Sequence, residues 1–128
     1  MRRTVKFQDV DAAGTIYFPR VLEYFADAYM EVLRAAGLDV PLMLREASMA
    51  APLAHAEADF MRPMVFGDDL DVDVVAVKVG KTSASFGYRI RKGADIAAVG
   101  QTVHVFVDPK TFKSTDAPPQ LRAWADKW

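Results

Sequence analysis

One segment of this sequence has the period of a long α-helix, and most of the chain after it has the period of β-strands. Between residues 19 and 36, apolar side chains recur at about 100° per residue, with charged side chains on the opposite face. Pro19 suits the first helical position because its missing N–H has no partner there, and Gly37 suits the left-handed cap. The face predicted to be buried carries Leu22, Phe25, Tyr29, Val32, Leu33 and Ala36.

Alternating segments dominate the rest of the chain. Period-2 alternation of apolar and polar residues indicates half-buried antiparallel strands. We predict such strands at 53–61, 69–79, 83–92 and 96–107, with hairpin turns at 80–81 and 92–95. The other expected elements are a short strand around 4–8, a second helix at 41–47 and a terminal helix at 118–124.

These elements predict an α+β fold in a single domain, residues 1–128. A lone helix with one apolar face must pack on the sheet around it. The expected architecture is therefore an antiparallel five-stranded sheet wrapped around one long central helix. One helix cannot cover both faces of a sheet, and Val75, Val77 and Val103 are expected on the uncovered face. Because large exposed apolar patches are rare on monomers, we expect a homo-oligomer, either a dimer or a tetramer.

The composition excludes several classes of site. Without cysteine, the chain cannot hold a disulfide, a thiolate zinc site or a cysteine nucleophile. Its 16 basic and 17 acidic residues give a net charge of −1, so we expect no nucleic-acid partner. No apolar stretch approaches the ~20 residues that span a bilayer, and no apolar region follows Arg2 and Arg3 as in a signal peptide. We therefore expect no membrane association and a cytoplasmic location.

The segment 7–19 is the most informative about chemistry. It places two carboxylates, Asp9 and Asp11, in a turn directly before the long helix. A helix N-terminus offers free N–H groups and the positive end of the helix dipole, so a carboxylate and an oxyanion donor meet in one short segment. That combination suits acyl transfer. Turns and helix caps also favour Asp for structural reasons alone, so on this pattern both interpretations stay open.

The first available donor at this helix start is the Phe18 backbone amide, because Pro19 has no N–H. The amides of Arg20 and Val21 are expected to follow it. A backbone amide in this position could bind developing negative charge on a carbonyl oxygen.

The two histidines, His55 and His104, fall in predicted strands, where a lone histidine is usually a packed or surface residue. His55, Glu57 and Asp59 share one strand face at i, i+2, i+4 spacing, which could in principle hold a metal. Strand alternation alone produces such rows. We therefore favour a polar sheet face or a subunit interface here, and predict no metal site.

The segment 7–19 resembles the 4-hydroxybenzoyl-CoA thioesterase family of hotdog-fold proteins. That family has Asp-x-Asp-x-x-Gly after its first strand, then β-branched and aromatic residues, then the central helix. This chain has Asp9-Val10-Asp11-Ala12-Ala13-Gly14 and Ile16-Tyr17-Phe18-Pro19 in that order. Residues 60–68 resemble the family's Phe-x-x-Pro-x-x-x-Gly-Asp segment. The resemblance covers nearly the whole chain, with the elements in the family's order.

The resemblance implies an acyl-CoA thioesterase for a small aromatic or a short- to medium-chain acyl group. Asp11 matches the family's catalytic carboxylate, which acts either as nucleophile or as general base on water. The Phe18 backbone amide matches the donor that polarises the thioester carbonyl. A carboxylate suits this task because a thiolate leaves without a strong general acid. Asp9 is expected to be a turn or interface residue, and Gly14 and Tyr17 to border the substrate.

The resemblance also implies where coenzyme A binds. Lys81 and Ser83 match positions that often contact the nucleotide, and Arg62 is a further candidate; Arg89 and Arg91 are the remaining ones. Coenzyme A is part of the substrate, so no separate cofactor is expected.

Two other functions remain open from the sequence. A thioesterase for acyl carrier protein would need a basic docking surface near the tunnel mouth. A non-catalytic hotdog module would bind acyl-CoA or a partner without hydrolysis, but Asp11, Gly14 and the unblocked helix start favour an enzyme. A dehydratase is disfavoured because neither histidine lies in the helix-entry segment.

Overall fold

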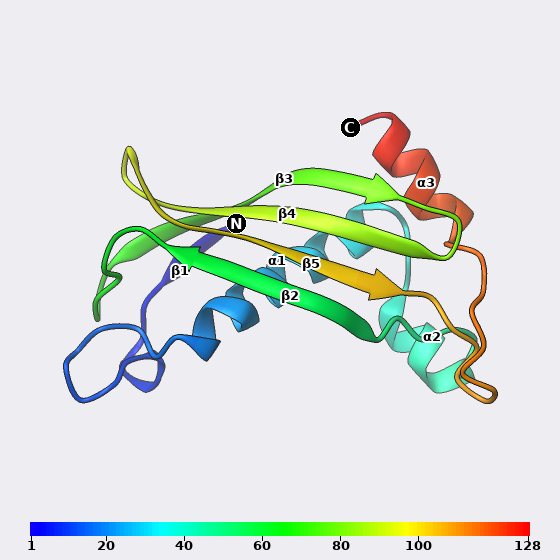
Figure 1. Cartoon of the computed structure of the whole chain (residues 1–128), viewed down its shortest axis with the longest axis horizontal. Helices are drawn as coiled ribbons and strands as arrows, with labels where there is room; N and C mark the ends of the chain where they lie inside the picture. Colours follow the sequence, from blue (N-terminus) through cyan, green and yellow to red (C-terminus); the bar gives the residue numbers. More distant parts are fainter.

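A computed structural model describes residues 1–128 and contains one five-stranded antiparallel sheet (Figure 1). The strand order is β1-β3-β4-β5-β2, so β1 and β2 form the two edges. The predicted sheet is confirmed, and its strands are β1 (Arg2–Thr4), β2 (Leu53–Phe60), β3 (Asp69–Val79), β4 (Ser83–Lys92) and β5 (Asp95–Val105).

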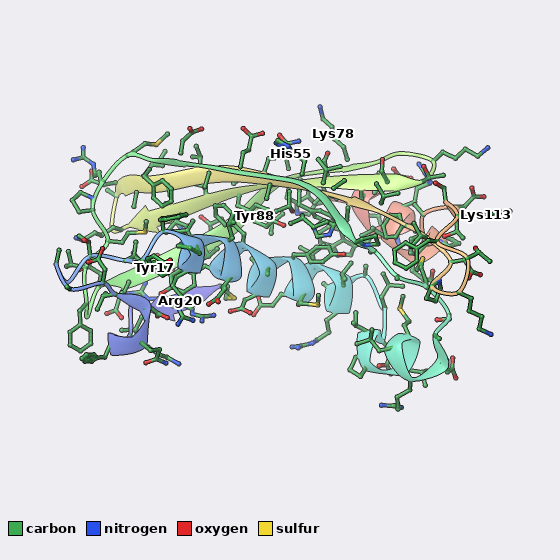
Figure 2. All side chains as sticks on the ribbon, turned by 60° about the horizontal axis from the view of Figure 1, so that its bottom comes forward. Tyr17, Arg20, His55, Lys78, Tyr88 and Lys113 are labelled. Carbon is green, nitrogen blue, oxygen red and sulfur yellow. The ribbon has the colours of Figure 1, made fainter.

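The long helix α1 (Pro19–Ala35) lies along one face of the sheet (Figure 2). The short helix α2 (Val40–Glu46) follows the C-terminal end of α1, and α3 (Pro119–Asp126) lies near the turn between β3 and β4 (Figure 1). His55 and Lys78 project from the opposite face of the sheet, whereas Tyr88 points toward α1. None of the helices combines the length and hydropathy needed to cross a lipid bilayer.

The core lies between α1 and the sheet. The Phe25 ring stacks on the Tyr88 ring with centroids 4.6 Å apart. Gly100 of β5 permits this close approach, because a Cβ there would overlap the Phe25 ring and the Glu57 carbonyl oxygen. The buried face of α1 differs from the predicted one at Leu22, which lies over a groove toward β2 and is 38% exposed. The helix residues that are buried are Val21, Tyr24, Phe25, Ala28, Tyr29, Val32 and Leu33.

The strand predicted around residues 4–8 is wrong. The first strand is confined to Arg2–Thr4, and residues Phe7–Asp9 form a short 3₁₀ helix, η1. The Asp9 carboxylate accepts hydrogen bonds from the Lys6 amide at 3.0 Å and from the Tyr24 hydroxyl at 2.7 Å. These bonds turn the chain back toward α1, so the alternation of residues 4–8 does not extend the sheet.

Val77 lies on the opposite face from the one predicted. The pairing of β3 with β4 shifts between Val74 and Ala76, so one residue is inserted and the alternation reverses beyond it. As a result Val77 and Val79 pack against the core, and Val75 is 45% exposed. The uncovered face of the sheet therefore carries fewer valines than the sequence pattern indicates.

Candidate active site

Asp11 lies on a closed loop that leads into α1. The Tyr17 amide donates to the Asp9 carbonyl at 2.8 Å, and the Asp11 amide donates to the Thr15 carbonyl at 2.9 Å. The loop therefore folds back on itself like a small hairpin. Its outgoing arm continues directly into the first turn of α1, so the carboxylate and the helix start belong to one hydrogen-bonded unit.

The Asp11 side chain is exposed, and only one of its oxygens is engaged. Oδ1 accepts from the Ala13 amide at 2.9 Å and from the Thr15 hydroxyl at 3.4 Å. Gly14 closes this turn with φ of +78°, a conformation that favours glycine, and its amide donates to the Asp11 carbonyl at 3.0 Å. The turn binds the carboxylate through Oδ1 and leaves Oδ2 without a partner, and a nucleophile or a base needs such a free oxygen.

The Phe18 amide is the unpaired donor at the start of α1. Pro19 has no N–H, and the Arg20 and Val21 amides donate to the Tyr17 and Phe18 carbonyls at 2.9 and 3.1 Å. The expectation that Arg20 and Val21 would also offer free amides is therefore wrong, because the first helical turn consumes both. One backbone amide, beside a 65% exposed Phe18 side chain, remains for a ligand oxygen.

Asp9 is a buried structural residue beneath this loop. Burial alone would raise the pKa of its carboxyl, but hydrogen bonds from Tyr24 and Lys6 and the charges of Arg20 and Arg3 outweigh burial and lower the pKa. The Arg3 guanidinium lies 4.5 Å from the Tyr24 ring centroid and pairs with Asp27. Asp9 thus ties η1 and the loop to α1, a structural role in a turn.

Residues 60–68, the second motif of the sequence, form backbone hydrogen bonds to the loop that carries Asp11. The Ile16 amide donates to the Met64 carbonyl at 2.8 Å, and the Phe66 amide donates to the Gly14 carbonyl at 3.1 Å. Asp68 stabilises this segment, because its carboxylate accepts from the Val65 amide at 2.8 Å. The segment 60–68 therefore forms the wall against which the Asp11 loop rests, which explains why the two motifs occur together.

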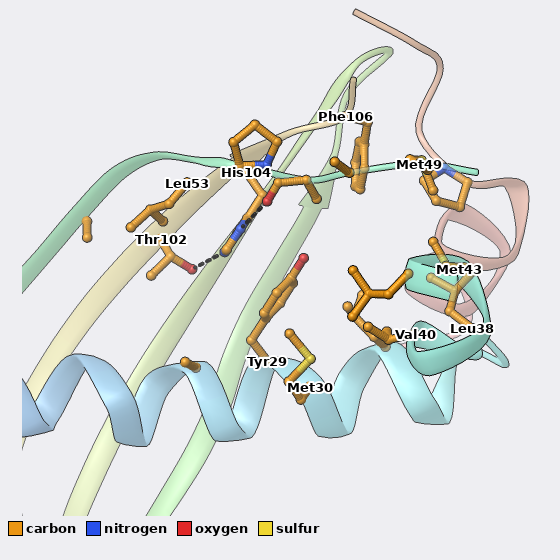
Figure 3. A pocket seen from close by; sticks show the side chains of 18 of the residues that line it. Tyr29, Met30, Leu38, Val40, Met43, Met49, Leu53, Thr102, His104 and Phe106 are labelled. Atoms are coloured by element: carbon orange, nitrogen blue, oxygen red, sulfur yellow. Dashed lines mark hydrogen bonds between the residues drawn. The ribbon is translucent and has the colours of Figure 1, made fainter. Parts of the chain in front are cut away.

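An apolar cavity lies along α1, from Leu22 toward the C-terminal end of the helix. It has a volume of about 550 Å³ and is enclosed by α1, α2, β2 and β5 (Figure 3). Its walls are mostly apolar, and the buried side chains with polar atoms in its lining are Tyr29, Tyr88, Thr102 and His104. Along α1 the cavity opens into a groove lined by Leu22, Ala26 and Met30.

Sequence reasoning missed this pocket. Met43 belongs to α2, Met49 to the segment after it and Leu53 to the start of β2, so no pattern within one element places them together. A usable signal did exist in β5, where Gly100, Thr102 and His104 share one strand face with i, i+2, i+4 spacing. The structure places Thr102 and His104 on the inner face, where both are buried.

The predicted nucleotide contacts do not gather around Asp11 within one chain. Arg62 lies beside the loop, in a hollow shared with Thr15 and Ile16. Lys81 and Ser83 lie at the turn between β3 and β4, at the far end of the sheet from the start of α1 (Figure 1).

The remaining candidate residues differ in whether their side chains are exposed or already paired within the chain. Arg89 and Arg91 both pair with Asp73, at 3.4 and 2.7 Å. Tyr17 is 53% exposed at the start of α1, in edge contact with the Phe18 ring. The histidines lie as expected of packed and surface residues: His104 is buried, and His55 is on the outer face within 3.3 Å of Glu57.

Comparison with known proteins identifies the family. Residues 5–125 match the thioesterase-like superfamily. Relatives from Nostoc punctiforme and Picosynechococcus, both named 1,4-dihydroxy-2-naphthoyl-CoA hydrolase, are 34% and 33% identical over 97% and 96% of this chain and 84% and 88% of theirs. The solved structure of a 1,4-dihydroxy-2-naphthoyl-CoA thioesterase from Synechocystis has a TM-score of 0.92, with 27% identity over 98% of this chain and 93% of that one.

These matches confirm the predicted hotdog fold and the predicted class of enzyme, a thioester hydrolase. They support the resemblance at the level of the superfamily, which is broader than the 4-hydroxybenzoyl-CoA thioesterase family. Because the match extends over nearly all of its residues, this chain belongs to the thioesterase-like superfamily.

Proposed function

We propose that this chain hydrolyses the thioester of an aromatic acyl-CoA, with 1,4-dihydroxy-2-naphthoyl-CoA as the leading substrate. The observation that carries the proposal is that full-length relatives at 33–34% identity bear the name of that activity. The large apolar pocket with a few buried polar groups supports it, because a bicyclic acyl group with hydroxyl substituents needs both kinds of surface.

The chemistry is assigned to Asp11 and the Phe18 amide, as in the 4-hydroxybenzoyl-CoA thioesterase family. The amide donates to the thioester carbonyl oxygen and stabilises the negative charge that develops there. The free Asp11 oxygen either attacks the carbonyl carbon, giving a mixed anhydride that water then hydrolyses, or removes a proton from an attacking water. Coenzyme A leaves as a thiolate in both routes, so neither needs a general acid. The single engaged oxygen of Asp11 and the unpaired Phe18 amide are compatible with both routes.

The acyl group is assigned to the pocket of a second copy of the chain. From Phe18 to Tyr29 the helix rises about 16 Å, which is longer than a bicyclic acyl group. An acyl group held at Phe18 therefore does not reach the polar side chains of its own pocket. In Figure 1, α1 starts at one end of the sheet and α2 lies at the other, so a two-fold axis near the middle of β2 exchanges these ends. Such a dimer brings the Asp11 loop of one copy toward the pocket of the other.

The free edge of the sheet supports such a dimer. β2 has a neighbour on one side only, and its end residues Leu53 and Phe60 are 55% and 49% exposed. An unpaired edge strand is a ready surface for a second strand. In the same arrangement Lys81 and Ser83 of one copy lie at the end of the sheet that receives the partner's loop, where they could meet the nucleotide of coenzyme A. Light scattering at micromolar concentration should give at least a dimer, and a monomer mass would contradict this arrangement.

The test of the proposed function is a thiol-release assay with the purified chain. The panel is 1,4-dihydroxy-2-naphthoyl-CoA, 4-hydroxybenzoyl-CoA, benzoyl-CoA and octanoyl-CoA, with the same dihydroxynaphthoyl group on acyl carrier protein for comparison. We expect the highest kcat/KM for the dihydroxynaphthoyl-CoA thioester. Absence of thiol release from every aromatic thioester, or a clear preference for octanoyl-CoA, would overturn the proposal.

A further inference from the structure

The pocket between α1, α2 and the sheet contains a row of polar groups whose hydrogen bonds can be followed one by one. The Tyr88 hydroxyl lies 2.7 Å from the Thr102 hydroxyl, and Thr102 lies 3.1 Å from His104 Nε2. His104 Nδ1 lies 3.4 Å from the Ala51 carbonyl oxygen, which can only accept, so Nδ1 carries the proton (Figure 3). Nε2 is then the acceptor for Thr102, whose oxygen in turn accepts from Tyr88.

This row uses both nitrogens of His104. Burial lowers the pKa of the imidazole, which agrees with the neutral form that the hydrogen bonds require. The row therefore offers a ligand no free N–H from His104, and the hydroxyl protons of Tyr88 and Thr102 are also engaged.

Tyr29 is the exception among the buried polar side chains of the pocket. Its ring stacks on the His104 ring with centroids 4.1 Å apart, and the residue is only 4% exposed. Its hydroxyl has no hydrogen-bond partner in the chain and points away from α1 into the pocket (Figure 3). Its oxygen is therefore open to the space of the pocket, where a ligand or a water can satisfy it.

We propose that the Tyr29 hydroxyl is a specificity determinant that binds a ring hydroxyl of the acyl group remote from the thioester. This inference rests on the proposed function and extends it to the chemistry of the acyl ring. In a 1,4-dihydroxy-2-naphthoyl group, the 1-hydroxyl is adjacent to the carbonyl and can bond to it internally. The 4-hydroxyl has no internal partner, so it can pair with Tyr29, whose hydroxyl is the one that the polar row of the pocket leaves free. A ring without that hydroxyl leaves Tyr29 unpaired, and a site of this kind discriminates against such a ligand.

The test compares two ligands that differ by one hydroxyl, in binding and in turnover. Binding is measured by calorimetry with 1,4-dihydroxy-2-naphthoic acid and 1-hydroxy-2-naphthoic acid, and turnover with their CoA thioesters. We expect the wild-type chain to prefer the dihydroxy ligand by about tenfold, the worth of a well-formed hydrogen bond. Tyr29→Phe should remove this preference. Tyr88→Phe is the matched variant: its hydroxyl already bonds to Thr102, so the preference should persist.

Each outcome bears on the proposal. Equal affinity of the wild-type chain for the two acids would overturn it without any variant, and so would a preference that survives in Tyr29→Phe. If the chain prefers the dihydroxy acid through Tyr29 but releases no thiol from either thioester, the proposed function fails and the ligand site stands. Turnover of both thioesters with no preference supports the function and refutes the role of Tyr29.

Discussion

The two ends of α1 differ in what they offer a thioester. At its start, the Asp11 loop presents a carboxylate oxygen and an unpaired amide to solvent, with no deep cavity around them. Toward its other end lies an apolar cavity of about 550 Å³ whose lining contains no carboxylate. The first region has reactive groups without an enclosure, and the second has an enclosure without reactive groups. A complete site therefore needs both regions, and within one chain the helical residues from Pro19 to Tyr29 separate the Phe18 amide from the polar end of the cavity.

Removing the carboxylate gives the largest expected effect and tests the first region alone. Asp11→Asn should lower kcat by about 10²-fold or more, the usual loss for a positioned base or nucleophile. Because the Asp11 side chain is exposed, the urea midpoint should barely change. The matched control is Asp126→Asn, an exposed aspartate near the C-terminus, which should keep wild-type turnover. Near-normal activity of Asp11→Asn would remove the carboxylate from the mechanism.

Asp9 lies two residues from Asp11 but should respond in the opposite manner. Asp9→Asn should cost about 1–3 kcal/mol of stability, because it weakens a buried hydrogen-bonded carboxylate, and should reduce kcat less than Asp11→Asn does. The pKa of Asp9 is lowered from its ordinary 3.8, so its contribution is present above that pH. The contribution is lost as the pH falls through the lower folded value. Urea titrations at pH 3 and pH 6 check this, and an equal loss of stability at both would contradict it.

In the cavity region, His104 should make the stability of the chain depend on pH in a higher range than Asp9 does. Burial lowers the pKa of His104 below its ordinary 6.5, so the unfolded chain takes up a proton near that pH and the folded chain does so only at lower pH. The unfolded state then binds more protons, and stability falls as the pH drops from 7 to 5. His104→Gln should flatten this dependence. His55→Gln, on the exposed outer face, is the control and should keep the wild-type slope.

The smallest expected effect is at the turn between β3 and β4. Lys81→Ala should raise KM for an acyl-CoA severalfold and leave kcat nearly unchanged, because a contact to the nucleotide does not touch the reacting atoms. A short thioester without the nucleotide should be hydrolysed at the wild-type rate. Lys78→Ala, on the outer face, is the matched control (Figure 2). Equal harm to both substrates would make Lys81 a structural residue.

Periodicity predicted the elements that pack along their whole length. α1 and the four long strands lie within one or two residues of their expected bounds, because each buries one face against the same core. The bulge at Val75 and the turn at Asp9 were not predictable in this way. The bulge depends on pairing between strands, and the turn depends on Tyr24, fifteen residues further along the chain. Alternation within one segment contains neither piece of information.

In the candidate site, too, the features carried by one segment were predictable and those that join separate segments were not. Asp11, Gly14 and the Phe18 amide could be predicted because one continuous segment carries them, and its turn and helix start have local signals. The pocket could not, because Tyr29, Met43 and His104 come from three separate elements. No local pattern reports that Lys81 lies at the opposite end of the sheet from Asp11, since that distance is a property of the sheet order.

The most direct test of the central claim, that the loop of one chain serves the pocket of another, is complementation between two inactive variants. Asp11→Asn removes the carboxylate, and Ala26→Trp fills the groove one helical turn before Met30. Each variant is first shown to dimerise and to be inactive alone, and the two are then unfolded together and refolded at equal concentration. A shared site predicts recovery of about one quarter of wild-type kcat, because half of the dimers are mixed and each has one intact site. If the site lies within one chain, every site in the mixture is defective, and no recovery of activity would contradict the account.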